Sequence, residues 1–388
     1  MKTTARRERG FSIVELMVGA AVGLIGITII THLYLTNEKY KRSTTGSGAA
    51  QVNGAIALYT VERDIRGAGY GVNHSSALSC TCTPSPCSPI QYHYNGVYSP
   101  MGAATALPIL IPAPVVIAST AGTPDSITVL SSNDGEGAMP TTLAESMATP
   151  GAAFRLDGTA GYIQPGTAPP ADSWSTPPGG YFVLVTQAGT CMLSRITNLV
   201  PASSSLEHST ASLWNSTTTL PTFSAGANVF NLGLNPIWRT YSVVTAANAY
   251  KLQVADVLRV IEGGAAQQIV DDLVDLQAEY GRDANNDGAI AATEWTATAP
   301  ASAAEWQQVL AIRVGVLARS GNYEQPAVAG GACTATTVTP TWAGSIDPVT
   351  TLSKPESVFT IPGGLPSCYK YRAFETVIPL RNMIWRPA

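Results

Sequence analysis

The feature that most constrains this chain is a predominantly apolar stretch of 25 residues, from Phe11 to Leu35, close to its beginning. As an α-helix the stretch would measure about 37 Å, enough to cross the ~30 Å hydrocarbon core of a membrane. A single acidic residue, Glu15, lies inside it. A carboxylate in such a segment is costly without a partner, so Glu15 is a candidate functional residue.

The short basic segment before the stretch, residues 1–10, helps to separate the possible roles of this helix. A secretory signal peptide would have a shorter apolar region that ends in a small-residue cleavage site, whereas this longer region ends in HLYLTNEKYKR without such a site. A plain membrane anchor with a cytoplasmic N-terminus accounts for the basic flank and for the length. It does not account for Glu15.

Residues 10–16, in the order Gly-Phe-Ser-Ile-Val-Glu-Leu, closely resemble the type IV prepilins. In that family a short basic leader ends in Gly, the next residue is often an N-methylated Phe, and Glu stands at the fifth mature position. The resemblance implies cleavage between Gly10 and Phe11 by a prepilin peptidase, followed by N-methylation of Phe11. It also implies an assembly role for Glu15, which would face the Phe11 amine of a neighbouring subunit, because each charge would otherwise be buried alone. The alternative is a Glu15 side chain that reaches the membrane surface without a partner.

Composition agrees with an exported domain. Only 12% of the residues are charged, Gly and Pro are frequent, and the 45% hydrophobic fraction can support a core. Removing the leader, which holds four basic residues and one acid, changes the formal net charge from −4 to −7. Nucleic-acid binding depends on Lys and Arg against phosphate, so no nucleic-acid partner is expected.

The rest of the chain predicts an α+β protein with a type IV pilin fold. Helical spacing of apolar residues continues as far as a possible glycine C-cap, so we expect one helix over residues 11–67. Its first part (11–35) is predicted to be transmembrane and its second part amphipathic, with glycines at 46, 48 and 54 able to bend or melt it. Residues 68–388 are expected to form an extracytoplasmic antiparallel β-sheet domain with long loops, packed on the helix.

Short runs of β-branched and apolar residues predict the strands of this domain. They are Ser126–Ser131, Tyr181–Thr186 and Cys191–Ile196 as a hairpin, Arg239–Thr245, Lys251–Val254, Val257–Glu262, 310–316 and Phe374–Arg381. Residues 274–280 alternate between apolar and polar, the period of a strand with one buried face. Stretches at 80–124, 132–180 and 320–365, rich in Ser, Thr, Pro and Gly, predict insertions or loops.

Later sequence patterns resemble the PilW-type minor pilins among the type IV prepilins. These patterns are Asp64-Ile65-Arg66 followed by Ala68-Gly69-Tyr70, Ile269–Leu273 leading into Leu276 and Tyr280, Ile312-Arg313-Val314 leading into Arg319, and Leu380-Arg381-Asn382. The resemblance implies a minor pilin that helps to prime pilus assembly and is located at the tip of the fimbrium.

The same resemblance implies a location and partners. The precursor would lie in the inner membrane with a periplasmic globular domain, and after assembly the subunit would be part of an extracellular pilus. Other minor and major pilins would bind through the N-terminal helix. Two alternatives remain, a J-like minor pseudopilin of a type II secretion system and a pilus-tip adhesive module.

The segment from Asp283 to Glu294 matches the calcium-loop pattern D-x-[DN]-x-[DN]-G-x5-E at every specified position. Asp283, Asn285 and Asp287 would supply side-chain oxygens, Ala289 a backbone carbonyl, and Glu294 both carboxylate oxygens. The predicted cofactor is a structural calcium ion. Because a predicted strand precedes the segment, it is not an EF-hand domain, and an ordinary Asx- and Gly-rich turn is the alternative.

Six cysteines predict up to three disulfides in an extracytoplasmic domain. They are Cys80, Cys82, Cys87, Cys191, Cys333 and Cys368. Sequence does not choose among the pairings, although Cys333 with Cys368 would close a Pro- and Gly-rich loop between two late strands. A metal site at Cys80–Cys87 is the alternative, but paired C-x-x-C units are missing.

No sequence motif indicates an enzyme. The chain contains no G-x-S-x-G, H-E-x-x-H or P-loop pattern, and its four histidines are scattered. Residues 67–71, Gly-Ala-Gly-Tyr-Gly, follow a predicted helix and not a strand, so they do not match a dinucleotide fingerprint. We therefore predict a non-enzymatic protein with no catalytic residue.

Overall fold

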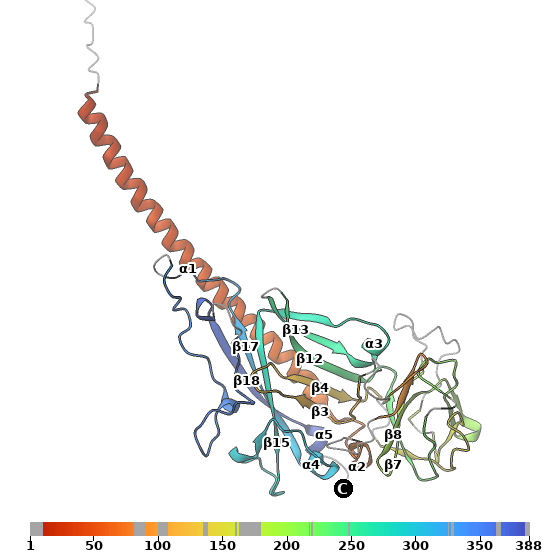
Figure 1. Ribbon diagram of the computed structural model, residues 1–388. Coiled ribbons are helices and arrows are strands. Elements are labelled where there is room, and N and C mark those ends of the chain that lie inside the picture. Colours follow the sequence, from red (N-terminus) through yellow and green to blue (C-terminus); the bar gives the residue numbers. More distant parts are fainter. Residues whose placement is uncertain are drawn as a thin grey trace, which may run out of the picture.

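The computed structural model shows a long N-terminal helix that projects from a β-rich body (Figure 1). The structure describes residues 11–80, 90–99, 108–134, 139–159, 161–162, 180–216, 218, 220–246, 249–324, 326, 330–361 and 366–384. The helix, α1 (Ile13–Gly67), has 55 residues. Its apolar first part is exposed and its second part packs on antiparallel sheets, which confirms the predicted α+β pilin-like fold.

The glycines in the middle of α1 do not interrupt it. The buried positions of the helix are Gly46, Ala50, Gly54, Ala57, Val61, Asp64 and Ile65. Because these positions recur every three or four residues, they form one stripe that faces the body. A Cβ atom at Gly54 would overlap the ring of Phe374, whereas Gly48 has open space around it. Gly54 therefore permits close helix–sheet contact.

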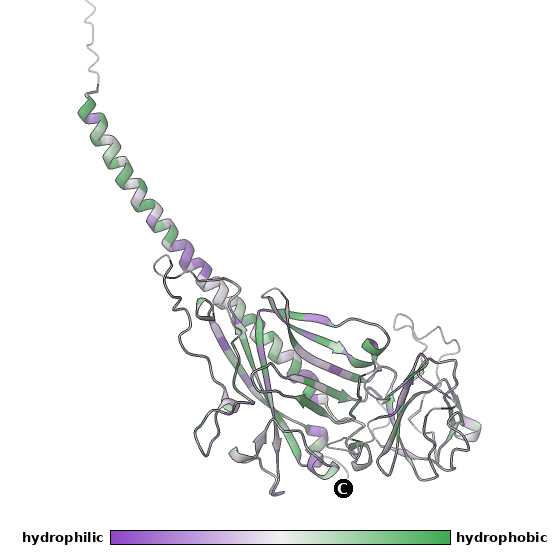
Figure 2. Cartoon of the chain, viewed as in Figure 1, coloured by the Kyte–Doolittle hydropathy of each residue, from purple (hydrophilic) through white to green (hydrophobic). Residues whose placement is uncertain are grey.

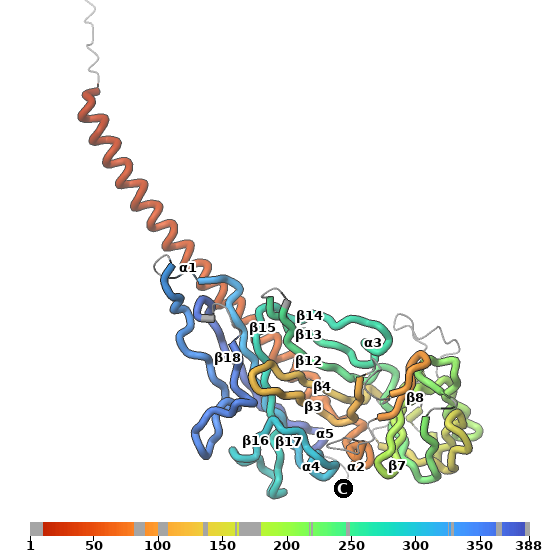
Figure 3. Tube along the Cα trace, viewed as in Figure 1, coloured from red at the N-terminus to blue at the C-terminus, as the bar shows by residue number. Residues whose placement is uncertain are grey.

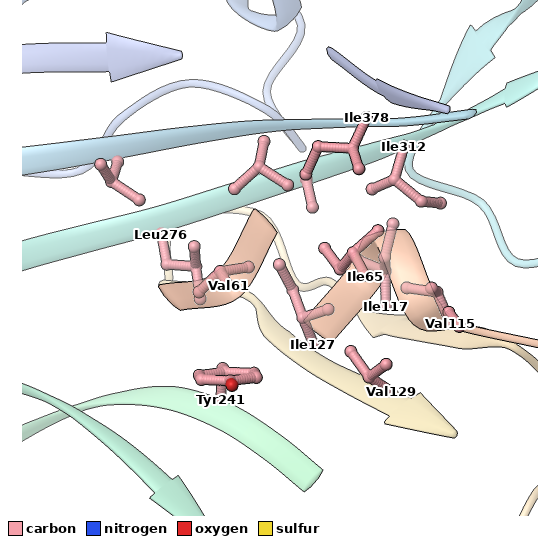
Figure 4. Packing of buried hydrophobic residues seen from close by; sticks show 14 of the residues in the cluster. Val61, Ile65, Val115, Ile117, Ile127, Val129, Tyr241, Leu276, Ile312 and Ile378 are labelled. Carbon is pink, nitrogen blue, oxygen red and sulfur yellow. The ribbon is translucent and has the colours of Figure 1, made fainter. Parts of the chain in front are cut away.

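Two antiparallel sheets enclose the C-terminal half of α1. The first has the order β14 (Gln267–Asp271), β13 (Ala249–Asp256), β12 (Ile237–Ala246), β4 (Ser126–Ser131), β3 (Val115–Ala118). The second has the order β16 (Trp295–Thr296), β15 (Leu273–Arg282), β17 (Val309–Arg319), β18 (Tyr371–Pro379). Figure 4 shows Val61 and Ile65 of α1 between Tyr241 of the first sheet and Leu276 and Ile312 of the second. The helix is thus the central element of the main core.

A further group of strands, here named the distal unit, lies at the end of the body away from the exposed part of α1 (Figure 3). It contains the sheet β5 (Thr141–Thr142), β11 (Asn228–Gly233), β7 (Phe182–Gln187), β8 (Thr190–Arg195). It also contains the sheet β6 (Phe154–Arg155), β10 (Ser205–Glu207), β9 (Asn198–Val200) and the hairpin β1 (Tyr92–Tyr94), β2 (Val97–Ser99). The predicted hairpin is confirmed as β7–β8, where Ala188 and Gly189 both have positive φ. Strands β1, β2, β3, β5 and β6 lie inside the stretches that were predicted as loops.

The two parts of the body share buried residues. Trp238 of β12 packs in one cluster with Phe182 and Trp214 of the distal unit. The Trp214 indole N–H also donates to the Glu262 carboxylate at 2.8 Å. A continuous apolar cluster and this hydrogen bond therefore connect the distal unit to the first sheet.

Short helices connect the strands. They are α2 (Ser75–Leu78), η1 (Pro201–Ser203), α3 (Val257–Ile261), η2 (Ala292–Glu294), α4 (Ala303–Gln307), η3 (Ala343–Ser345), η4 (Pro366–Cys368) and α5 (Arg381–Ile384). The strand predicted at Val257–Glu262 was wrong, because this segment is α3. The Asp256 side chain accepts the Arg259 N–H at 3.1 Å and begins the helix, and Leu258 and Ile261 share its buried side.

The sequence correctly predicted that β15 is a strand, but wrongly predicted that one of its sides is exposed to solvent. Alternation predicted a strand with one solvent-facing side, yet every residue from Leu273 to Gly281 is buried. The segment that follows β17 folds over the polar side, where Trp342 and Phe359 pack with Val274 of β15. A register shift between Leu273 and Asp275 places Val274 on this covered side. For residues 276–280 alternation does report which side faces the helix, but it does not reveal that a later segment covers the other side.

Candidate functional site

The residues predicted for processing and assembly lie at the free end of α1. Gly10 is outside the described residues, and the Phe11 side chain is exposed. Ser12 and Glu15 cap the helix reciprocally, since the Glu15 N–H donates to the Ser12 hydroxyl at 3.2 Å and the Ser12 N–H donates to the Glu15 carboxylate at 3.0 Å. The Glu15 charge therefore lies at the positive end of the helix dipole in the single chain.

The exposed part of α1 has the properties of a membrane anchor. Within the described residues, α1 is the one helix long and apolar enough to cross a membrane, and its most apolar segment makes no buried contact with the body. Figure 2 shows this part as largely hydrophobic up to a polar band near the body. The Thr28 and Thr31 hydroxyls donate at 2.8 Å to the Leu24 and Ile27 carbonyls, which satisfies them in an apolar environment.

The other end of α1 is tied to the body by a buried carboxylate. Asp64 is almost fully buried and accepts hydrogen bonds from the Arg239 guanidinium at 2.9 Å and the Tyr241 hydroxyl at 2.5 Å. Burial and this hydrogen bond raise the pKa of Tyr241 above its ordinary value. The paired charge fixes the rotation of the helix between the two sheets.

Two of the patterns that resemble PilW-type pilins, at residues 64–70 and 380–382, meet at this helix end. The Asn382 side chain donates to the carbonyls of Gly67 (3.1 Å) and Ala68 (3.0 Å), although these residues are more than 300 positions apart in sequence. Gly69 adopts φ +80°, and its N–H donates to the Leu130 carbonyl of β4 at 2.8 Å. A side chain at that φ would be strained. These residues therefore act together in closing the helix end.

The predicted calcium loop connects β15 to β16, as a strand-flanked turn. Both Asp283 carboxylate oxygens accept loop N–H groups, from Asp287 at 3.0 Å and Gly288 at 2.9 Å. The Glu294 carboxylate reaches back across the loop to the N–H groups of Ala284 (3.1 Å) and Ala291 (2.8 Å). The side chains at both ends of the pattern thus turn inward and hold the loop closed.

The loop meets part of the requirement for a calcium site. Each carboxylate oxygen has two lone pairs and uses one for a backbone amide, which leaves capacity for a cation. Ile290 packs inward, with its Cδ1 2.7 Å from the position of a Cβ on Gly281. In the described part of the chain, however, no three His, Cys, Asp or Glu side chains lie close enough together to hold a metal ion. The arrangement also fits the alternative of an Asx turn stabilised by its own amides.

Two disulfides are formed by the cysteines that the structure describes. Cys333 pairs with Cys368, the pairing that the sequence favoured, and Cys80 pairs with Cys191 of β8. Cys82 and Cys87 lie outside the described residues. Because Cys80 follows α2 and Cys191 lies in the distal unit, this second disulfide links the distal unit to the chain that leaves α1.

Sequence reasoning missed a set of buried acids beside β15. Asp125, just before β4, accepts the Ala278 N–H at 2.8 Å, and its own N–H donates to the Leu276 carbonyl at 2.7 Å. Burial, together with the charges of Asp275 and Glu279, raises the pKa of Asp125 to about 7, against the Ala278 hydrogen bond. Burial likewise raises the pKa of Asp275 to about 6. β16 pairs only with the end of β15, and Asp125 hydrogen-bonds to the same edge of β15 before that point. Because Asp125 directly precedes β4 of the first sheet, it connects the first sheet to the second.

Glu279 is the charged centre on the covered side of β15. It is fully buried and pairs with Arg313 of β17 and with Lys354 of the covering segment, and it accepts the Ser357 hydroxyl at 2.8 Å. The Arg313 guanidinium also lies over the Trp295 ring, 4.8 Å from its centroid. The only sequence signal for this network is the polar alternation along β15. That alternation does not indicate that the partners of Glu279 are Arg313 and Lys354, which are distant in sequence.

The histidines occupy structural positions. The His74 side chain accepts the Ser76 N–H at 3.2 Å and begins α2. His208 stacks on Phe154 and contacts the Ala152 carbonyl at 2.8 Å, and burial lowers its pKa. His93 lies 3.1 Å from the Leu213 carbonyl. The contacts of these three histidines are with backbone groups, the Ser76 hydroxyl and neighbouring aromatic rings.

Two family models match the chain. The prokaryotic N-terminal methylation motif matches residues 5–31, and the type IV pilus-assembly protein W matches residues 240–382, from β12 to α5. No curated protein and no solved structure gave a match. The anchored helix, the methylation motif and the sheets around α1 define a type IV prepilin-like protein.

Within that class, residues 240–382 are similar to the type IV pilus-assembly protein W, which supports a minor pilin associated with a type IV pilus. The matched region contains most of β12, all of the second sheet and Asn382, so it covers part of the framework that holds the end of α1. Arg239 and β4 precede it. All strands of the distal unit precede the matched region. Pilin-family domains indicate a structural protein that interacts with other pilus components.

Proposed function

We propose that this protein takes part in priming pilus assembly and lies at the pilus tip. The observation that carries the proposal is an apolar surface that continues along α1 beyond its membrane part. Val52, Ile56 and Tyr59 are 57%, 44% and 65% exposed, and their spacing of four and three residues places them on one outward side of the helix. Apolar side chains in such a row favour burial against another subunit.

The size of the body supports the position at the tip. The distal unit extends the body away from the membrane part of α1 (Figure 1). In a shaft of closely packed subunits such an extension would crowd its neighbours, whereas at an end of the fibre one side remains free. The pairing of Glu15 with a neighbour's Phe11 amine would replace the local Ser12 cap during assembly, since both charges are then neutralised in the apolar environment.

A clean deletion, complemented with either wild type or Glu15→Ala, tests the proposal. We expect loss of surface pili in the deletion and in the Glu15→Ala strain, with protein secretion unchanged. Replacement of Val52, Ile56 and Tyr59 by Ser should reduce piliation without lowering the melting temperature, because the side chains are exposed in the single chain. Normal pilus number in the deletion would contradict the proposal. Loss of secretion with intact pili would instead support the J-like pseudopilin.

An adhesive role of the distal unit is the second candidate. The unit contains a separate cluster of buried residues, among them Phe154, Leu206 and Val229, so it is built as a body of its own on the pilin framework. Trimming its exposed loops should abolish attachment and leave pilus number unchanged if this role is correct. Loss of pili on trimming would support the priming role instead.

We also propose that the loop from Asp283 to Glu294 binds a structural calcium ion. Its ligands would be the Asp283, Asn285 and Asp287 side chains, the Ala289 carbonyl and the Glu294 carboxylate, and the ion would offset the repulsion among the three acids. Calcium titration of the full chain in detergent tests this, with Asp287→Ala as the variant and Asp347→Ala as a control in a different loop. Absence of binding at about millimolar calcium, the range of extracellular modules, would leave an ordinary turn.

A further inference from the structure

A small part of the body holds α1 where the helix leaves it. The Asn322 amide donates to the Arg42 carbonyl at 3.4 Å, and the Lys370 ammonium donates to the Ser43 hydroxyl. Asn322 follows β17 and Lys370 precedes β18, so the two residues lie at the two ends of the segment that connects these strands and covers β15. In Figure 1 this segment, drawn in blue, runs beside the helix at the label α1.

A cavity of about 420 Å³ lies at this junction. Leu35, Glu38, Lys39 and Arg42 line it from α1, and Tyr323 and Glu324 line it from the segment after β17. The four helix residues lie on one side of the helix because they are separated by three, four and seven positions. The cavity therefore has an apolar end at Leu35 and charged groups of both signs beyond it.

The depth of the cavity in the membrane follows from the helix. Leu35 is the last residue of the apolar stretch, and Lys39 lies about 6 Å further along the helix axis at 1.5 Å per residue. The headgroup layer extends about 5–8 Å beyond the hydrocarbon core on each side. Two exposed tyrosines, Tyr34 and Tyr40, lie at the same level, where aromatic side chains are enriched in membrane proteins.

The charged side chains at the cavity are of two kinds, those paired with an opposite charge and Lys39, which is not paired within the described residues. Arg42 pairs with Glu38 at 3.1 Å, and Lys370 pairs with Glu324 at 3.2 Å. Lys39 is exposed and forms no hydrogen bond or ion pair with any residue that the structure describes. Lys39 and Arg42 can thus receive a phosphate, while Glu38 and Glu324 can accept hydrogen bonds from an ammonium group.

We propose that this cavity binds the headgroup of a phosphatidylethanolamine-type lipid from the leaflet on the body's side of the membrane. The phosphate lies against Lys39 and Arg42, the primary ammonium donates to Glu38 or Glu324, and the acyl chains run along the apolar helix from Leu35. Such a lipid sets the height of the body above the membrane and holds the unassembled subunit there. This inference goes beyond the assembly role and does not depend on it.

Native mass spectrometry of the full chain in detergent tests the proposal with three added lipids of identical acyl chains. We expect the ethanolamine lipid to form single adducts in preference to the glycerol lipid, which lacks the ammonium, and to the choline lipid, whose quaternary ammonium cannot donate hydrogen bonds. Lys39→Ala should lower the ethanolamine adduct about threefold to tenfold, the loss of one exposed charge-assisted hydrogen bond. Lys41→Ala is the matched control, because Lys41 carries the same charge and does not line the cavity.

Two further measurements test whether the site recognises the whole headgroup or phosphate alone, and whether the variants keep the fold. Soluble O-phosphoethanolamine should compete with the ethanolamine lipid, whereas inorganic phosphate at the same concentration should not. Melting temperatures of both lysine variants should equal that of the wild type. Equal adducts from the three lipids, equal effects of the two lysine variants, or competition by inorganic phosphate alone would each overturn the headgroup site.

Discussion

Asp125 makes the stability of this protein depend on pH near neutrality. Its pKa is about 7 in the folded chain and 3.8 in the unfolded reference. The folded state therefore keeps a proton that the unfolded state has already lost, and this contribution is fully present below pH 3.8 and is lost as the pH rises through 7. The difference of about three pKa units corresponds to at most about 4 kcal/mol, at 1.36 kcal/mol per unit.

The variant Asp125→Asn removes this ionisation and keeps an oxygen that can accept the Ala278 N–H. We expect the variant to unfold at a higher temperature than the wild type at pH 8 and at about the same temperature at pH 4. Its melting temperature should therefore change less across this range. Some pH dependence should remain, because Asp275 has a pKa of about 6 and loses its proton in the same window. Thermal unfolding of the full chain in detergent, followed by tryptophan fluorescence from pH 4 to pH 8, measures this.

Asp347→Asn is the matched control. Asp347 is partly exposed, and hydrogen bonds from the Thr350 and Val349 N–H groups lower its pKa. Its contribution is present above the unfolded pKa and is lost only as the pH falls below that value, so the control should follow the wild type between pH 5 and pH 8. If Asp125→Asn keeps the wild-type slope, or is destabilised equally at pH 4 and pH 8, the buried carboxylate does not act as described.

Two further predictions concern the packing of α1 and the disulfides. Gly54→Ala should destabilise the protein by about 1–3 kcal/mol, because the new methyl group would displace the Phe374 ring. Gly48→Ala should stabilise it by about 0.5–1 kcal/mol, because that site is open and Ala favours helix; urea unfolding of both variants measures the difference, and equal signs would refute the close contact. Replacing Cys80 and Cys191 by Ser should cost about 1 kcal/mol more than replacing Cys333 and Cys368, because the first pair closes 111 residues and the second 35. The same urea assay tests this order, and a larger loss for the shorter loop would contradict it.

The parts of the site that the sequence could predict are those whose signals are local. The α1 helix, its apolar first part and the β7–β8 hairpin follow from periodicity and from turn residues a few positions apart. The capping partners Ser12 and Glu15 are only three residues apart. The signal for α3 is also local, since Asp256 caps the helix, but the prediction of a strand rested on the apolar run alone.

What the sequence by itself determined is a long apolar helix with a prepilin motif, joined to a β-rich domain of the pilin class, because apolar length, a leader motif and strand periodicity all act within neighbouring residues. Only the tertiary structure decided which distant groups meet. Asp64 finds Arg239, Asp125 finds Ala278, and the polar side of β15 is covered by a segment that begins after β17. Such pairings depend on chain topology, and the free energy of burying a charge depends on every element that covers it.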